Sequence, residues 1–268
     1  MSEGFSADWL ALREPYDAQA RSASLLARLA AWRGGHDMLR VVDLGAGTGS
    51  NLRVTAASLG GAQDWTLVEL DPALIAAGHE RLAQAEVAWR YRRLDLAQDL
   101  ERLGEQPVDL IAASALLDLV GAAWLSRLVA WRAETGAALH IALTFDGRID
   151  WRPLDDGDSI VAGLVLAHQH GDKGFGPALG PNAVAVLRSL LAGVRGELLV
   201  DASDWALDAA DRAIQAALLD GYAAAAGATA TERRAATNAW QVRRQRLIAA
   251  GRSSLRVGHL DLLFLPEA

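Results

Sequence analysis

The segment Val41–Asn51 carries three glycines at a spacing that could bring the main chain close to a bound ligand. It reads Val-Val-Asp-Leu-Gly-Ala-Gly-Thr-Gly-Ser-Asn, so Gly45, Gly47 and Gly49 follow a short apolar run. Glycine adopts dihedral angles that a side chain forbids and lets a ligand lie against the backbone. A helix that begins after such a turn points its N-terminal N–H groups at the same place. The string therefore predicts a cofactor-binding turn between a buried strand and a helix.

The glycine spacing separates two classes of cofactor. Dinucleotide-binding turns have the spacing G-x-G-x-x-G, whereas this turn has G-x-G-x-G, with Ser50 at the position of their third glycine and an acid, Asp43, two residues before the first. The string resembles motif I of the class I, Rossmann-like S-adenosylmethionine-dependent methyltransferases. The resemblance implies that S-adenosyl-L-methionine is the cofactor and that the turn binds it through Asp43, Gly45, Ala46, Gly47, Thr48 and Asn51.

Further stretches match the motifs of that family in the family's order. Glu69, at the end of a second apolar run, matches the acid that accepts hydrogen bonds from the ribose hydroxyls, with Leu70 beside it. Asp71 falls one step further on, so we expect it to cap the helix that Pro72 begins.

The remaining two motifs lie at the ends of the third and fourth expected strands. Asp95 and Leu96 match the positions that bind the adenine ring. The stretch 108–118 resembles motif IV, and its polar side chains that could contact the cofactor are Ser114 and Asp118. Taken singly, each acid is better explained as a helix cap or a turn residue. Four motifs in order, each at the C-terminal end of an expected strand, favour one ligand site, because ligands bind at that edge of a parallel sheet.

Short apolar runs alternate with helical patterns from residue 39 onward, which predicts an α/β fold with a parallel sheet. Strands are expected at 39–44, 65–70, 87–94, 108–112, 137–145, 196–202 and 254–265. The family resemblance implies a Rossmann-like, seven-stranded, mostly parallel sheet with an antiparallel last strand, helices on both faces and helical cap elements. We expect residues 1–35 to form an N-terminal helical lid and residues 36–268 the methyltransferase domain, with cap insertions at about 146–180 and 204–252.

The segment before the first strand offers two further contacts to the cofactor. Residues 6–32 are expected to form two helices broken near Pro15, which place Tyr16 and Arg21 just before the core. Arg21 could pair bidentately with the carboxylate of the methyl donor, and Tyr16 could cover its methionine end. A solvated helix face explains the same residues equally well.

Methyl transfer is an in-line displacement at an electrophilic sulfonium, so the enzyme mainly aligns the acceptor and excludes water. A hydroxyl acceptor also needs a base with a pKa near the working pH. His168 and His170 are the favoured bases, because they precede a glycine-rich loop in the region where this family commonly builds its acceptor pocket. Asp146 and Asp150, just past the fifth strand, are rivals, and a merely solvated position is the alternative for all four.

Two other histidines and one metal-like spacing are interpreted as structural. His140 and His259 fall inside expected strands, where a histidine is more often a core residue than a catalyst. The spacing His168-x-His170-x-Asp172 is compatible with metal ligands, but no further carboxylates cluster with it recognisably, so no metal is expected.

Composition and charge limit the classes of protein to which the chain could belong. The 268 residues carry a formal net charge of −7 and no cysteine, which excludes disulfides and thiolate chemistry and argues against a nucleic-acid partner. The N-terminal stretch lacks the pattern of a signal peptide, and no apolar run is long enough for a membrane span, so a cytoplasmic bacterial protein is expected. Whether the chain forms a homodimer stays open.

The function expected from these observations is methyl transfer to a small molecule, directed to oxygen. The Asn/Asp-Pro-Pro-Tyr pattern of enzymes that methylate nitrogens in nucleic acids and proteins is absent from motif IV. Two alternatives stay open. One is a regulatory protein that binds S-adenosylmethionine without turnover. The other is a nicotinamide-dependent oxidoreductase, which the glycine spacing and the lack of a Tyr-x-x-x-Lys pair disfavour.

Overall fold

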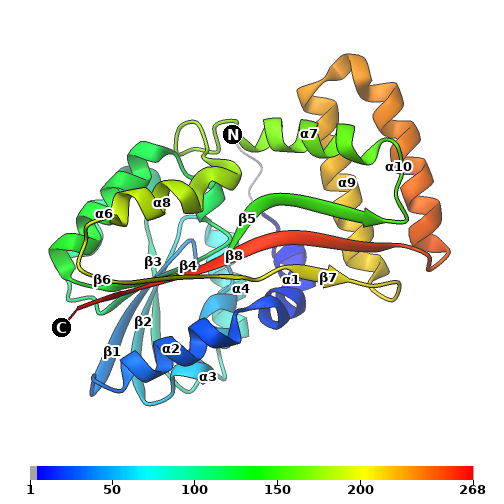
Figure 1. Cartoon of the computed structure of the whole chain (residues 1–268). Coiled ribbons are helices and arrows are strands. Elements are labelled where there is room, and N and C mark those ends of the chain that lie inside the picture. The colour runs from blue at the N-terminus through cyan, green and yellow to red at the C-terminus, as the bar shows by residue number, and fades with distance from the viewer. Residues whose placement is uncertain (1–4, 268) are drawn as a thin grey trace.

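The computed structural model describes residues 5–267, which form one sheet flanked by helices (Figure 1). The order of the strands across the sheet is β3-β2-β1-β4-β5-β8-β6, and β7 pairs with β8. The strands are β1 (Met38–Leu44), β2 (Ala62–Glu69), β3 (Ala88–Arg93), β4 (Leu110–Ser114), β5 (Ala138–Arg152), β6 (Gly196–Ala202), β7 (Trp205–Leu207) and β8 (Ser254–Pro266).

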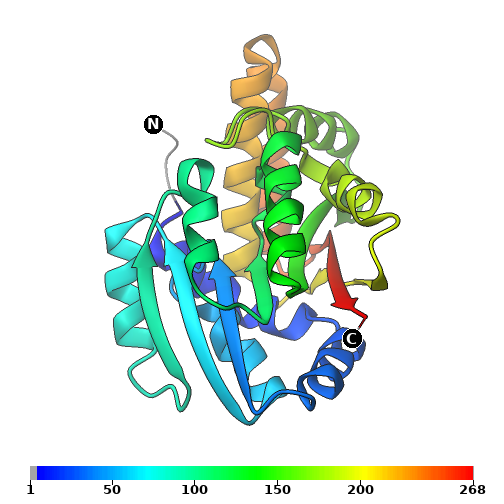
Figure 2. The same cartoon turned by 90° about the vertical axis from the view of Figure 1, so that its left-hand side faces the viewer.

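The first five strands are parallel, and β8 runs antiparallel to β5, β6 and β7. Figure 2 shows β1, β2 and β3 side by side with their arrowheads at the same edge. The predicted Rossmann-like α/β sheet with an antiparallel last strand is therefore confirmed. The short β7 was not predicted, because three residues are too few to show a strand pattern. Strand β5 also continues past its expected end, through register shifts between Ile141 and Thr144 and between Phe145 and Ile149.

Helices cover both faces of the sheet and extend beyond its end. They are α1 (Ala7–Ala20), α2 (Ala23–Arg33), α3 (Ser50–Leu59), α4 (Pro72–Arg81), α5 (Leu96–Asp99), α6 (Ala122–Thr135), α7 (Asp158–Gln169), α8 (Ala183–Leu191), α9 (Arg212–Thr229) and α10 (Arg234–Ala249), with short 3-10 turns at η1 (Leu100–Glu105), η2 (Leu117–Leu119), η3 (Gly180–Asn182) and η4 (Thr231–Arg233). One face packs against α6 and α8 through Leu128 and Leu187, and the other against α2 and α3 through Leu29 and Leu52.

The N-terminal helices are divided at a different place from the one expected. Helix α1 continues through Pro15 to Ala20, and the chain turns at Arg21, whose ψ of 137° is extended. The backbone N–H of Ser22 donates to Asp261 Oδ2 at 2.9 Å, and the Ser22 hydroxyl caps α2 by accepting from Leu25 N. The prediction of a break near Pro15 is therefore wrong. Ser22, which is held by the buried carboxylate of Asp261, caps the start of α2 and so separates it from α1.

Helices α7, α9 and α10, called the cap below, rise beyond one end of the sheet (Figure 1). Their apolar faces meet the ends of β5 and β8 in a third core cluster that includes Trp151, Ile214 and Trp240. Arg244 is fully buried there and forms an ion pair with Asp158. Within residues 5–267 no helix has the length and apolar character needed to span a bilayer.

Candidate cofactor and acceptor site

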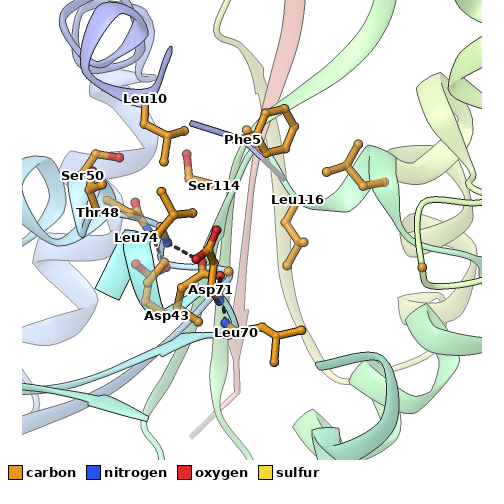
Figure 3. Close-up of a pocket in the computed structure, with 18 of the residues that line it drawn as sticks. Phe5, Leu10, Asp43, Thr48, Ser50, Leu70, Asp71, Leu74, Ser114 and Leu116 are labelled. Atoms are coloured by element: carbon orange, nitrogen blue, oxygen red, sulfur yellow. Dashed lines mark hydrogen bonds between the residues drawn. The ribbon is translucent and has the colours of Figure 1, made fainter. Parts of the chain in front are cut away.

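A cavity of about 680 Å³, called the cofactor cavity below, lies at the C-terminal ends of β1, β2 and β4. Figure 3 shows Asp43, Thr48, Asp71 and Ser114 around this space, with Leu10 of α1 above them in the view. The cavity therefore lies where parallel α/β sheets bind their ligands.

The glycine turn forms the floor of the cofactor cavity as the sequence predicts. Gly47 and Gly49 have φ values of 53° and 78°, which side chains rarely adopt. A Cβ at Gly49 would lie 2.6 Å from Leu82 Cδ1, and one at Gly47 would lie 3.0 Å from Leu10 Cδ1. The backbone therefore favours glycine at these two positions, and helix α3 begins directly after the turn.

The carboxylate of Glu69 fixes this turn to the end of β2. Glu69 Oε2 accepts from Gly47 N at 2.9 Å, while Oε1 accepts from Leu70 N at 2.8 Å and Asp71 N at 3.0 Å. The side chain also lines the cofactor cavity, as expected for the ribose-binding acid. Each carboxylate oxygen has two lone-pair sites, so Glu69 can hold the turn and still accept from a ligand hydroxyl.

Two other predicted acids, Asp71 and Asp95, cap helices and also line the cofactor cavity. Asp71 Oδ1 accepts from Ala73 N at 2.8 Å, which confirms it as the cap of α4. Asp95 caps α5 through Ala97 N at 2.9 Å and also lines the cavity. Leu96 is buried in the core, and its carbonyl accepts from Trp124 Nε1. Helix capping and cavity lining are therefore combined in Asp71 and Asp95.

A chain of buried polar groups lies behind the glycine turn. Asn51 Nδ2 donates to Asp43 Oδ1 at 2.7 Å, and Arg21 Nη2 donates to Asn51 Oδ1 and Ser114 Oγ, both at 3.0 Å. Burial raises the pKa of Asp43 to about 7, against the opposing effects of the Asn51 hydrogen bond and the Arg21 charge. Burial likewise lowers the pKa of Arg21.

Several atoms of this polar network are buried and have no hydrogen-bond partner among residues 5–267. They are Arg21 Nε and Nη1, Asp43 Oδ2 and Thr48 Oγ1. Unpaired buried polar atoms are costly, so such a cluster fits a ligand with complementary charges. The amino acid end of S-adenosylmethionine has an ammonium for Asp43, which lines the cavity, and a carboxylate whose charge Arg21 would balance from behind Asn51 and Ser114. The residues present therefore fit this cofactor.

A second cavity of about 710 Å³, called the acceptor cavity below, adjoins the first. The two share Phe5, Arg13, Ala115, Leu119 and Lys173 in their walls. Ala115 has a φ of 52°, a strained value for a residue with a side chain, at the point where the cavities meet. The other walls are mainly apolar and come from α1, β5, the cap, β7 and β8, including Trp9, Leu143, Phe145, Val165, Trp205, Leu218, Tyr222 and Val257.

Asp118, His259 and His168 are among the titratable side chains that line the acceptor cavity. Asp118 is 6% exposed, and burial raises its pKa to about 6, although the charge of Arg13 acts in the opposite direction. Burial lowers the pKa of His259 to about 4. Burial and the charge of Lys173 lower the pKa of His168. At neutral pH the two histidines are therefore uncharged, and Asp118 titrates close to the working range.

The structure places several predicted residues elsewhere than expected. Asp118, predicted to contact the cofactor, lines the acceptor cavity instead, because the chain turns away from the sheet after β4. Tyr16 lines neither cavity, since its hydroxyl donates to Asp211 Oδ1 at 2.9 Å. Arg21 lies one layer behind the cofactor cavity, which it reaches through Asn51 and Ser114.

Of the predicted bases, only His168 reaches a cavity. His170 Nδ1 lies 3.2 Å from the carbonyl oxygen of Ala178 and holds its loop. Asp146 forms an ion pair with Arg148, and Asp150 lies in β5 opposite Arg256, so neither carboxylate lines a cavity. His259, expected to be a core residue, lines the acceptor cavity. Its place inside a strand gave no signal of this, because the sequence does not show which strand ends the cap covers.

Metal ligation has no support in the described part of the chain. Over residues 5–267 no three His, Cys, Asp or Glu side chains are grouped as a metal site requires.

Comparisons with known proteins agree with this geometry. Residues 41–133 match the family model described as a methyltransferase domain. The cyclopropane synthase MmaA2 from Mycobacterium tuberculosis is 14% identical in sequence, with a TM-score of 0.51 over 97% of this chain and 94% of that one. No curated protein matches the sequence.

Two further solved structures are similar at lower TM-scores. A putative sarcosine dimethylglycine methyltransferase from Galdieria sulphuraria is 14% identical over 91% of this chain and 84% of that one, with a TM-score of 0.45. An S-adenosylmethionine-dependent methyltransferase from Thiobacillus denitrificans, in complex with S-adenosyl-L-homocysteine, is 18% identical over 97% and 98%, with a TM-score of 0.45.

The strand order, the glycine turn and the matched domain together define a Rossmann-like methyltransferase fold with its ligand cavity at the expected edge. Residues 41–133 match a methyltransferase domain, and the fold around them is that of the Rossmann-like S-adenosylmethionine-dependent methyltransferases. S-adenosylmethionine is the methyl donor of this domain, and the acceptor cavity has the volume of a small-molecule site. The nicotinamide-dependent alternative is thereby set aside.

Proposed function

We propose that this enzyme methylates a hydroxyl group of a small, largely apolar molecule held in the acceptor cavity. The observation that carries the proposal is the position of Asp118. Its buried carboxyl lies in the wall of a cavity that opens onto the cofactor cavity at Ala115 and Leu119. A proton-accepting group is therefore available close to where the acceptor meets the methyl donor.

Bound S-adenosylmethionine supplies an electrophilic methyl group on its sulfonium. The acceptor oxygen forms a bond to the methyl carbon as the carbon–sulfur bond breaks, and the hydroxyl proton passes to Asp118. A carboxylate with a pKa of about 6 suits this role, because a general base acts best near its own pKa. His259 is a weaker candidate, since burial lowers the pKa of its ring to about 4.

The walls of the acceptor cavity indicate the shape of the acceptor. Trp9 and Trp205 are flat aromatic surfaces, and Phe145 adds a third. Aromatic walls favour a flat, apolar body and exclude water from the reaction. We propose that α1, the first helix of the segment 1–35, acts as a lid here. The insertions at about 146–180 and 204–252 contribute Val165, His168, Trp205 and Leu218.

The direct test is product identification from a panel of phenols, alcohols, amines and thiols incubated with isotopically labelled S-adenosylmethionine. The proposal predicts methyl ethers as products in mass and NMR spectra. It also predicts that Asp118→Asn lowers the rate of their formation about a hundredfold while leaving cofactor affinity unchanged. Products methylated at nitrogen, sulfur or carbon would contradict the oxygen assignment. Tight cofactor binding without any transfer, even from a metabolite extract, would favour the regulatory alternative.

A further inference from the structure

We propose that Lys173 binds an anionic group of the acceptor, so that the acceptor is an apolar molecule bearing a carboxylate or a similar oxyanion. This inference deepens the proposed function and rests on the acceptor cavity described above. Lys173 is the only lysine in the sequence, and its side chain lines both cavities where they meet.

The loop that carries Lys173 is held in place by its own contacts. Asp172 Oδ1 accepts from Gly174 N at 2.7 Å and from Gly176 N at 3.1 Å. The ring of Phe175 packs edge-on against Trp124, with 5.5 Å between the ring centroids. These contacts hold the loop in one conformation, so the ammonium group is presented to the cavity from a fixed base.

The ammonium group of Lys173 keeps donors available for a ligand. Its Nζ lies 3.3 Å from Nδ1 of His168, whose ring is kept neutral because burial and the lysine charge lower its pKa. An ammonium has three N–H donors, so two are free once the neutral ring has accepted one. Among residues 5–267 no carboxylate lies within ion-pair distance of Lys173. A half-buried cation without a counterion calls for an anionic ligand.

The other cation of the acceptor cavity is already neutralised. The guanidinium of Arg13 donates to both carboxylate oxygens of Asp17, at 2.8 and 3.1 Å, and lies 5.1 Å from the ring centroid of Trp205. Arg13 therefore serves as part of the cavity wall, and Lys173 is left as the group that can attract an anion.

The two cations act on different parts of the acceptor cavity. The charge of Arg13 lowers the pKa of Asp118, whereas the charge of Lys173 lowers the pKa of His168. An acceptor whose anionic group lies on Lys173 would thus keep that group away from the Asp118 carboxylate. Its apolar body would lie against the aromatic walls, with its hydroxyl directed to Asp118.

A matched pair of fluorescent probes tests the inference without turnover. The anionic 8-anilinonaphthalene-1-sulfonate and the neutral N-phenyl-1-naphthylamine share an apolar body and differ by the sulfonate. Both are titrated into the full chain saturated with S-adenosylhomocysteine, which occupies the cofactor cavity. We expect the wild type to bind the sulfonate at least tenfold more tightly than the neutral probe. Lys173→Met should remove this preference and leave the affinity for the neutral probe within twofold.

Arg246→Met is the matched control, because Arg246 is exposed on α10 and lines neither cavity. It should retain the wild-type preference. Equal binding of the two probes by the wild type, or a preference that survives in Lys173→Met, would overturn the inference while leaving the proposed function intact. Binding of neither probe would contradict the apolar acceptor cavity itself. A tenfold loss of S-adenosylhomocysteine affinity in Lys173→Met would assign the lysine to the cofactor and also overturn the inference.

Discussion

Arg21 donates a hydrogen bond of 3.0 Å from Nη2 to Ser114 Oγ, which joins the residue after α1 to the last residue of β4. The same nitrogen donates to Asn51 Oδ1, and Asn51 in turn donates to Asp43. Three segments distant in sequence, at Arg21, Asp43–Asn51 and Ser114, thus meet behind the glycine turn. Because Arg21 Nε and Nη1 have no partner among residues 5–267, we propose that Arg21 contributes to cofactor binding.

The first prediction concerns that arginine. Arg21→Met removes the cation that we expect to balance the carboxylate of the cofactor, so affinity for S-adenosylhomocysteine should fall about tenfold, a typical loss for one charge-assisted contact. Isothermal titration calorimetry measures the change. Arg28→Met is the control, because Arg28 is exposed on α2 and pairs with Glu197 away from the cavity. Equal affinities of the two variants would refute the role of Arg21.

The second prediction concerns the pH dependence of cofactor binding. Burial raises the pKa of Asp43 to about 7, so below that pH the free protein holds this carboxyl protonated. The ammonium of S-adenosylhomocysteine favours the ionised form, so binding releases a proton at low pH. Affinity should therefore rise with pH up to about 7 and then level off. Asp43→Asn should bind more weakly and without this slope between pH 5.5 and 8. A wild-type affinity that is flat over that range would exclude an ion pair between Asp43 and the ligand.

The third prediction concerns the rate of methyl transfer. Because burial raises the pKa of Asp118 to about 6, the carboxyl is protonated below that pH and cannot accept the hydroxyl proton. With an acceptor from the panel above, kcat should rise with pH through about 6. Asp118→Asn should lower kcat about a hundredfold, the usual contribution of a general base, and should flatten the profile. A variant that keeps the wild-type pH profile would show that another group takes the proton.

The fourth prediction concerns the closure of α1 over the cofactor. Glu14 accepts from Arg53 Nε at 2.6 Å and from Arg81 Nη1 at 3.1 Å, which ties α1 to α3 and α4. Loss of a part-buried ion pair worth about 1 kcal/mol corresponds to about a fivefold change. Glu14→Ala should therefore release labelled S-adenosylmethionine about fivefold faster in a chase experiment. Glu80→Ala, at an exposed position of α4, should release it at the wild-type rate. Identical rates for both variants would mean that α1 does not limit release.

The parts of the fold that could be predicted are those specified by local chemistry. The glycine turn requires residues without side chains at Gly47 and Gly49, and that requirement is visible in the sequence. Strands β1, β2 and β4 contain apolar stretches because helices bury both of their faces, whereas the edge strand β3 contains three arginines. The Rossmann-like core and its cofactor edge were predictable for these reasons.

The parts that could not be predicted depend on contacts between distant segments. The break after α1 is set by Asp261, which lies 239 residues beyond Ser22 and accepts from its backbone N–H. Similarly, Asp118 and His259 meet in one cavity only because β8 returns beside β5 and the cap covers that end. A strand pattern shows that His259 lies on a sheet, but it does not show whether a cavity adjoins it.

The central claim is that the cofactor lies against the glycine turn and that the Glu69 carboxylate accepts hydrogen bonds from its ribose hydroxyls. Calorimetric titration of S-adenosylhomocysteine into Glu69→Ala tests it most directly. Glu105→Ala serves as the control, since its side chain is 71% exposed and its nearest ionic partner, Arg92, is 3.6 Å away. Glu69→Ala loses both the acceptor for Gly47 N and the partner of the ribose hydroxyls, so its Kd should rise by about 30-fold or more, as expected for two hydrogen bonds to a charged group. A Kd equal to that of Glu105→Ala would contradict the account.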